Sequence, residues 1–136
     1  MNDYLAGKNI VITGAGSGIG KAIALSVARE GANIVVADYG VALDGSEPTN
    51  DIAESTAEEI RSLGVEAIPV AGDVSKMETG AQIISTAIEN WGSVDGVVCV
   101  AGILRERMLF NMSEDEWDAV FAVHIKGHFT VYRHAM

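Results

Sequence analysis

Four glycines lie in the short segment Gly14-Ala-Gly-Ser-Gly-Ile-Gly20, between an apolar run and a helical pattern. Glycine adopts positive φ at no steric cost and has no side chain to keep a ligand away from the backbone. The helix that follows would point its first free N–H groups and the positive end of its dipole at this turn. The segment therefore predicts a site for a phosphate-bearing ligand.

The spacing of these glycines distinguishes the kinds of phosphate-binding loop. A mononucleotide P-loop needs G-x-x-x-x-G-K-[ST], but an alanine follows Gly20-Lys21 and another stands at the place of the first glycine. The dinucleotide pattern G-x-G-x-x-G is not met strictly, because Gly14 and Gly16 would require glycine at Ile19. The P-loop is excluded, and the dinucleotide loop is present only in a modified form.

A third pattern, G-x-G-x-G from Gly14 to Gly18, is similar to the loop of S-adenosylmethionine-dependent methyltransferases. Those proteins usually carry an acidic residue just before the first glycine. Ile12 and Thr13 stand there in this chain, so methyl transfer is the weaker alternative.

The pattern that fits is T-G-x-x-x-G-I-G, from Thr13 to Gly20, and it resembles the coenzyme loop of the short-chain dehydrogenase/reductase family. Within that family the chain is similar to the dehydrogenase region of peroxisomal multifunctional enzymes, which oxidise (3R)-hydroxyacyl-CoA. The shared features are the long loop after Asp38 and the runs Ala101–Arg107 and Val123–Gly127. The resemblance implies a Rossmann fold and a nicotinamide cofactor. It also implies hydride transfer between a secondary alcohol and a ketone, with a 3-hydroxyacyl thioester as one candidate substrate.

Strand and helix patterns alternate four times along the chain. Apolar runs predict strands over residues 9–13, 33–38, 66–71 and 95–100. A first helix is predicted over 17–30, and a second from a cap at Thr49 or Asn50 to Gly64. A third begins at the capping box Ser75-x-x-Glu78, and a fourth runs from the capping box Ser113-x-x-Glu116 to Met136. This alternation predicts the first four strands and helices of a doubly wound α/β sheet with parallel strands in the order 3-2-1-4. The ligand would lie past the carboxyl ends of strands one and four.

Asp38 ends the second predicted strand and is the candidate for recognising the cofactor's ribose. An acid there can accept hydrogen bonds from both hydroxyls of the adenosine ribose. It would also face the 2′-phosphate of NADP, and like charges about 4 Å apart repel by about 4 kcal/mol at an effective dielectric of about 20. Ser17 and Tyr39 stand where NADP-preferring proteins often carry arginine or lysine. The sequence therefore predicts NAD in preference to NADP; the alternative is that Asp38 only caps a strand end.

The family resemblance assigns further cofactor contacts around the crevice. Asp73-Val74 resembles the pair that holds the adenine ring, with a turn or helix-capping aspartate as the alternative. Ala101-Gly102 resembles the end of the family's N-N-A-G motif, although Cys99-Val100 replace both asparagines. The predicted cofactor-binding residues are Gly14, Gly16, Ser17, Gly18, Ile19, Gly20, Asp38, Tyr39, Asp73, Val74, Ala101, Gly102 and Val123.

His124 is the one predicted catalytic-site residue, and it too rests on the resemblance. An asparagine often stands at this place in the family and positions a water-linked lysine in the proton relay. Histidine can both accept and donate a hydrogen bond, so it could take that role. The alternative is a histidine that satisfies its hydrogen bonds within a helix interface.

The family acts through a serine and a Tyr-x-x-x-Lys pair that follow the fifth strand, and the tyrosine transfers the proton of the substrate hydroxyl. The sequence has one Tyr-x-x-x-Lys, Tyr4–Lys8, which precedes the first strand and which we interpret as a coincidence. We therefore expect residues 1–136 to be the NAD-binding half of a longer parent, inactive alone. The alternative is a module that binds NAD(H) and does no hydride chemistry.

Composition argues against several other classes of function. A net charge of −10 without a basic cluster argues against nucleic acid and anionic membrane surfaces as partners. Cys99, the single cysteine, excludes an internal disulfide, and its apolar neighbours favour a core position. The N-terminus lacks signal-peptide features and no apolar run is long enough to span a membrane, which predicts a cytoplasmic protein. No metal is predicted; the expected partners are a small alcohol or ketone and, in the full-length form, further copies of the chain.

Overall fold

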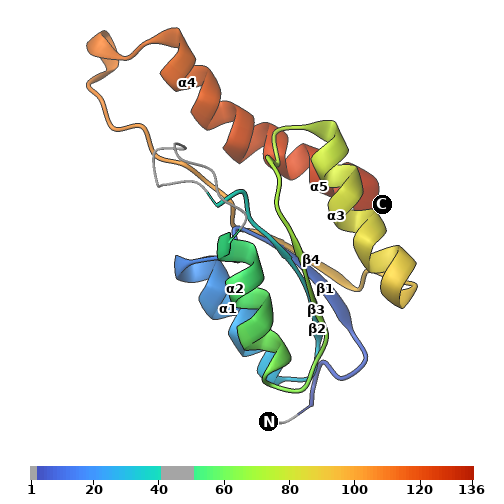
Figure 1. The fold of residues 1–136 in the computed structure, drawn as a ribbon. Coiled ribbons are helices and arrows are strands. Elements are labelled where there is room, and N and C mark those ends of the chain that lie inside the picture. The colour runs from blue at the N-terminus through green and yellow to red at the C-terminus, as the bar shows by residue number, and fades with distance from the viewer. Residues whose placement is uncertain (1–2, 41–50) are drawn as a thin grey trace.

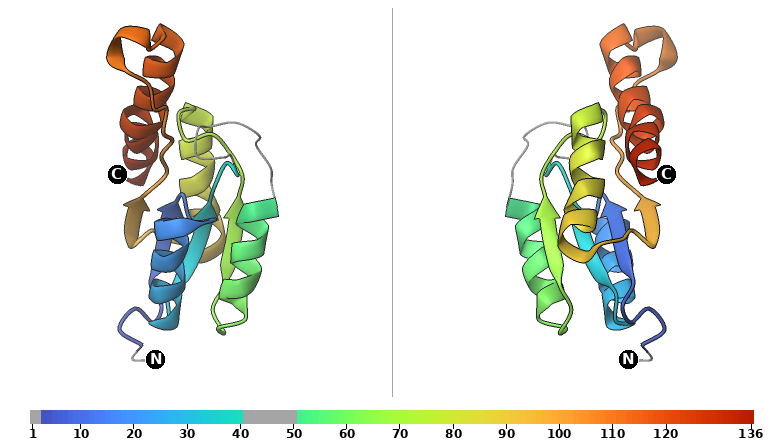
Figure 2. Two further views of the ribbon diagram at one scale, coloured as in Figure 1. Left: turned by 90° about the vertical axis from the view of Figure 1, so that its left-hand side faces the viewer. Right: turned by 90° about the vertical axis from the view of Figure 1, so that its right-hand side faces the viewer.

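The computed structural model describes residues 3–40 and 51–136. In these residues four parallel strands form one sheet in the order β3-β2-β1-β4. The strands are β1 (Asn9–Thr13), β2 (Asn33–Ala37), β3 (Ala67–Val70) and β4 (Gly96–Cys99). Helices α1 (Gly18–Arg29) and α2 (Asp51–Arg61) cover one face, and α3 (Met77–Trp91) and α5 (Gly127–Ala135) cover the other (Figures 1 and 2). The predicted fold class and strand order are confirmed.

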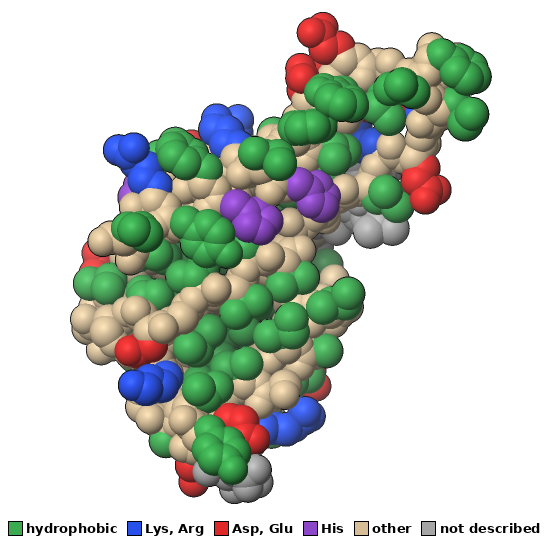
Figure 3. Space-filling view, turned by 180° about the vertical axis from the view of Figure 1, so that it is seen from behind, with side chains coloured by type: hydrophobic (Ala, Val, Ile, Leu, Met, Phe, Trp, Pro, Cys, Tyr) green, Lys and Arg blue, Asp and Glu red, His purple; other side chains and the backbone are tan. Residues whose placement is uncertain are grey.

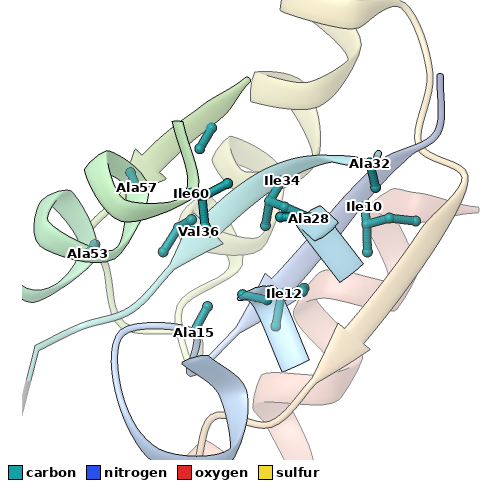
Figure 4. Packing of buried hydrophobic residues seen from close by; sticks show 12 residues of the cluster. Ile10, Ile12, Ala15, Ala28, Ala32, Ile34, Val36, Ala53, Ala57 and Ile60 are labelled. Carbon is teal, nitrogen blue, oxygen red and sulfur yellow. The ribbon is translucent and has the colours of Figure 1, made fainter. Parts of the chain in front are cut away.

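The two central strands are apolar throughout because helices cover both of their faces. Alternate residues of each strand point to opposite sides of the sheet. Ile12 and Ile34 pack toward α1 and α2 (Figure 4), whereas Val11 and Val35 pack toward α3 and α5. All four side chains are fully buried. The strand β4 lies at the edge of this sheet, and its four residues are half-buried.

The ends of the helices confirm some of the predicted caps and correct one. The α1 helix ends before Gly31, which has φ +96°. The capping box at Ser113 is formed, since its hydroxyl accepts from the Glu116 N–H at 3.1 Å. The capping box predicted at Ser75 is wrong: α3 begins at Met77, with Lys76 at the N-cap.

The cause of that correction is a competing turn. The N–H and the hydroxyl of Ser75 donate to Asp73 Oδ1 at 2.9 and 2.7 Å, so Ser75 belongs to the Asp73 turn and the helix begins two residues later. The caps predicted at Thr49 and Asn50, and the loop from residue 41, lie outside the described residues.

The helix predicted from Ser113 to Met136 is present in three parts. α4 (Glu114–Phe121) continues through a π-helical segment (Ala122–Lys126) into α5. A short 3-10 helix (Leu109–Asn111) precedes α4, which extends beyond the carboxyl ends of the strands (Figure 1). Apolar side chains gather along this projecting part (Figure 3). Trp117, Phe121, Ile125 and Phe129 are each between 45 and 63% exposed.

Candidate functional site

A cavity of about 500 Å³ lies at the carboxyl ends of the strands. Its volume falls in the usual range for small-molecule and cofactor sites. All predicted cofactor-binding residues line it except Gly16 and Gly18. The lining residues that were not among the predicted cofactor contacts are Ala37, Gly72, Ser75, Val100, Ile103, Arg105, Ala119 and Ala122.

The glycine loop forms one wall by bringing β1, α1 and β4 close together. Gly14 has φ +69°, and a Cβ there would lie 2.7 Å from the Ala101 backbone nitrogen. A Cβ on Gly20 would overlap the carbonyl oxygen of Gly14. Ser17 is the N-cap of α1, whose first N–H groups have no acceptor within the helix. The bare backbone and the helix N-terminus together suit the pyrophosphate of a dinucleotide.

Thr13 ties the end of β1 to the end of β4. Its hydroxyl accepts from the N–H groups of Val100 and Ala101 at 3.2 and 3.3 Å. Thr13 is only 1% exposed, so the two bonds are shielded from water. This hydroxyl holds the two strand ends together although Cys99 and Val100 replace the family's two asparagines.

Asp38 combines a structural role with an orientation toward the cavity. Its Oδ2 accepts from the Gly16 N–H and its Oδ1 from the Gly40 N–H, both at 2.7 Å. Each carboxylate oxygen has two acceptor positions, so both retain capacity for ribose hydroxyls. Asp38 and Tyr39 line the cavity, whereas Gly16 lies behind Asp38. The alternative role of Asp38, capping the strand end, therefore corresponds to contacts that are present. These contacts do not block the carboxylate from binding a ribose.

Asp73 and Val74 line the cavity where β3 leads into α3. The turn alternative for Asp73 also describes a real contact, because Oδ1 holds Ser75. Val74 is fixed from the opposite side by the Thr130 hydroxyl of α5, which donates to its carbonyl at 2.6 Å. This turn is therefore held by its own hydrogen bonds and by α5.

The π-helical segment completes the opposite wall. It contributes Ala122 and Val123 to the cavity, together with Ala101 and Gly102 after β4. No pattern in the sequence predicts a π segment, since its residues continue the helical pattern without a break. Segments of this kind frequently occur at functional sites.

His124 belongs to the same π segment, but it is not among the residues that line the cavity. Its Nε2 lies 2.9 Å from the carbonyl oxygen and 3.2 Å from the nitrogen of Ile103. A Cβ on Gly102 would come within 2.5 Å of its Cε1. The imidazole thus packs on the outside of the turn that forms the wall. Its catalytic role remains a prediction.

Charge in and around the cavity comes from Asp38, Asp73 and Arg105. The neighbouring Arg107 is paired with Glu116 at 2.8 Å, and this hydrogen bond lowers the pKa of that carboxyl. Cys99 is half-buried and packs against the core from the edge strand, and burial raises the pKa of its thiol, which keeps it protonated at neutral pH. Within residues 3–40 and 51–136, no three His, Cys, Asp or Glu side chains are grouped to hold a metal ion. The same residues contain no helix long and apolar enough to cross a membrane.

Comparison with known proteins places these features in one family. The family model described as short chain dehydrogenase matches residues 8–136. The hydroxyacyl-CoA dehydrogenase ChsB1 of Mycobacterium tuberculosis is 47% identical over 96% of this chain and 40% of its own length. The peroxisomal multifunctional enzyme type 2 of Mus musculus is 36% identical over 95% of this chain and 17% of its own length.

A solved structure agrees with the sequence comparisons. The crystal structure of a short chain dehydrogenase from Mycobacterium avium is similar with a TM-score of 0.86 and 48% identity, over 96% of this chain and 47% of that one. The chain therefore spans less than half the length of each of these relatives. The chain belongs to the short-chain dehydrogenase family.

Proposed function

We propose that residues 1–136 are the NAD-binding half of an oxidoreductase that interconverts a secondary alcohol and a ketone. The observation that carries the proposal is that the glycine loop and Asp38 meet at one cavity. The name of one relative, hydroxyacyl-CoA dehydrogenase, supports a 3-hydroxyacyl thioester as the substrate. NAD supplies the hydride acceptor for such a reaction.

The residues of this chain bind and orient the cofactor. The loop from Gly14 to Gly20 and the N-terminus of α1 would hold the pyrophosphate. Asp38 would hold the adenosine ribose, with Ser17 and Tyr39 beside it. Asp73-Val74 would hold the adenine ring. Ala101, Gly102 and Val123 would line the remaining length of the cofactor and orient it toward the substrate.

In this proposal His124 acts by holding the cavity wall. Replacing His124 with alanine removes the hydrogen bond to Ile103, and we expect NAD affinity to fall about fivefold, the value of roughly one hydrogen bond. His124→Gln, whose amide reaches as far as the imidazole Nε2, is expected to retain most of the affinity. His134→Ala is the control, since that imidazole bonds to the Thr130 carbonyl of its own helix. Calorimetric titration with NAD checks this, and equal affinity in the alanine and glutamine variants would contradict it.

We further propose that the chain alone transfers no hydride. The serine and Tyr-x-x-x-Lys pair that the family resemblance implies have no counterpart after β1 in this sequence. The substrate pocket and proton transfer would then belong to another part of the full-length protein. For that protein we propose a cytoplasmic location and a homo-oligomer, and the exposed apolar side chains of α4 and the π segment support the second point.

Ligand-induced thermal shift tests the proposed function against its alternatives. We expect NAD to raise the melting temperature of the chain and S-adenosylmethionine to leave it unchanged, because a bound ligand stabilises only the state that binds it. We expect no NAD-linked absorbance change with 3-hydroxyacyl thioesters for the 136-residue chain. Stabilisation by S-adenosylmethionine in preference to NAD would favour the methyltransferase instead.

A further inference from the structure

Thr56 of α2 is a buried polar residue that reaches the glycine loop. Its side chain is fully buried, and its hydroxyl donates to the Gly16 carbonyl at 3.1 Å, across forty residues of sequence. A threonine inside a helix commonly bonds to a carbonyl of the preceding turn of its own helix. This one is directed at another element, and a buried carbonyl without that partner would be costly.

The preceding peptide unit, between Ala15 and Gly16, is held as well. Its N–H donates to Asp38 Oδ2 at 2.7 Å, and a Cβ at Gly16 would overlap Ile52 Cγ2. Asp38 at the end of β2 and two side chains of α2 therefore fix the middle of the glycine loop. The next residue, Ser17, lines the cavity and occupies the N-cap position of α1. A rotation of the peptide between Gly16 and Ser17 would consequently move groups that face the cavity.

The helix that carries Thr56 is firmly packed. Its neighbours Ala53 and Ala57 are buried in the same cluster as Ala15 of the loop (Figure 4). On the surface, Lys21 of α1 pairs with Glu59 of α2 at 2.9 Å. The small side chains allow α2 to approach closely, so the Thr56 hydroxyl acts from a fixed position.

We propose that Thr56 is a positioning residue that sets the orientation of the peptide between Gly16 and Ser17 and thereby the affinity of the glycine loop for the cofactor's pyrophosphate. The inference rests on the proposed NAD-binding function. It assigns a part of the cofactor site to α2, a helix that contributes no residue to the cavity lining in the described part of the chain.

A comparison of valine and serine at this position tests the proposal. Thr56→Val keeps the shape and removes the hydroxyl, and Thr56→Ser keeps the hydroxyl and removes a buried methyl group. Both changes are expected to lower stability, so a stability measurement does not separate a role in cofactor binding from a role in folding alone. NAD affinity, measured well below the melting temperature, is expected to fall about fivefold in the valine variant and to stay within about twofold in the serine variant.

Thr86→Val is the matched control, because the Thr86 hydroxyl bonds to the Gln82 carbonyl within its own helix. We expect that variant to bind NAD like the unmodified chain. Equal NAD affinity in Thr56→Val and the unmodified chain would overturn the role of Thr56 and leave the proposed function standing. Failure of the unmodified chain to bind NAD would overturn both.

Discussion

Replacing Gly14 with alanine is expected to lower the free energy of unfolding by about 3 kcal/mol and to abolish detectable NAD binding. Two separate costs add at this position. Gly14 has φ +69°, where an alanine is strained by about 1–2 kcal/mol. The new Cβ would also lie within 2.8 Å of the Ala101 backbone, and a backbone contact cannot move aside as a flexible side chain can. Urea unfolding and calorimetric titration measure the two effects.

Gly18 provides the matched control inside the same loop. It also has positive φ, +54°, but a Cβ there would meet no atom within 4 Å. Gly18→Ala should therefore show only the conformational cost, about 1 kcal/mol. If the two variants lost the same stability, the close approach of the loop to β4 would not be what requires glycine at position 14.

The second large effect is expected from Asp38→Asn. A hydrogen bond to a charged acceptor is worth about 1.5–3 kcal/mol. NAD affinity should therefore fall at least tenfold, which corresponds to a loss of about 1.4 kcal/mol of binding free energy. The preference for NAD over NADP should fall as well, because the repulsion between Asp38 and the 2′-phosphate is lost. That repulsion of about 4 kcal/mol is reduced by solvent and salt, so we expect the ratio of the two dissociation constants to change by about tenfold or more. Titrations of the variant with both cofactors give this ratio.

Asp73→Asn is the control for that experiment. Asp73 is a second carboxylate at the cavity, but it lies at the β3–α3 turn and holds Ser75. Its replacement is expected to weaken NAD and NADP equally and to leave their ratio unchanged. A ratio that shifts as much in this variant as in Asp38→Asn would show that net cavity charge, and not the position of Asp38, determines the preference.

The sequence predicted the fold well because its signals are local and agree with one another. The apolar runs mark the strands β1 and β2, and the glycines that follow the helices mark the helix ends. Parallel βαβ units then allow few strand orders. The glycine loop and Asp38 could be placed at one edge for the same reason, since the carboxyl ends of parallel strands meet there. The predicted boundaries of β2, β3 and β4 exceed the observed ones by one residue at an end or at both ends.

What the sequence did not predict depends on contacts that its local patterns do not specify. Ser75 and Glu78 have capping-box spacing, but Asp73 competes for the serine and the helix starts later. Nothing in the sequence distinguishes Thr56 from other helical threonines, because its partner is forty residues away. The π segment lies beside two further contacts of this kind: Thr130 of α5 donates to the Val74 carbonyl, and the His124 imidazole bonds to Ile103.

Calorimetric titration of the unmodified chain with NAD and with NADP tests the central claim most directly. The arrangement of the glycine loop and Asp38 predicts saturable binding of one NAD per chain, with NADP bound at least about tenfold more weakly. Binding of neither cofactor, or binding of NADP as tight as that of NAD, would contradict this account of the site.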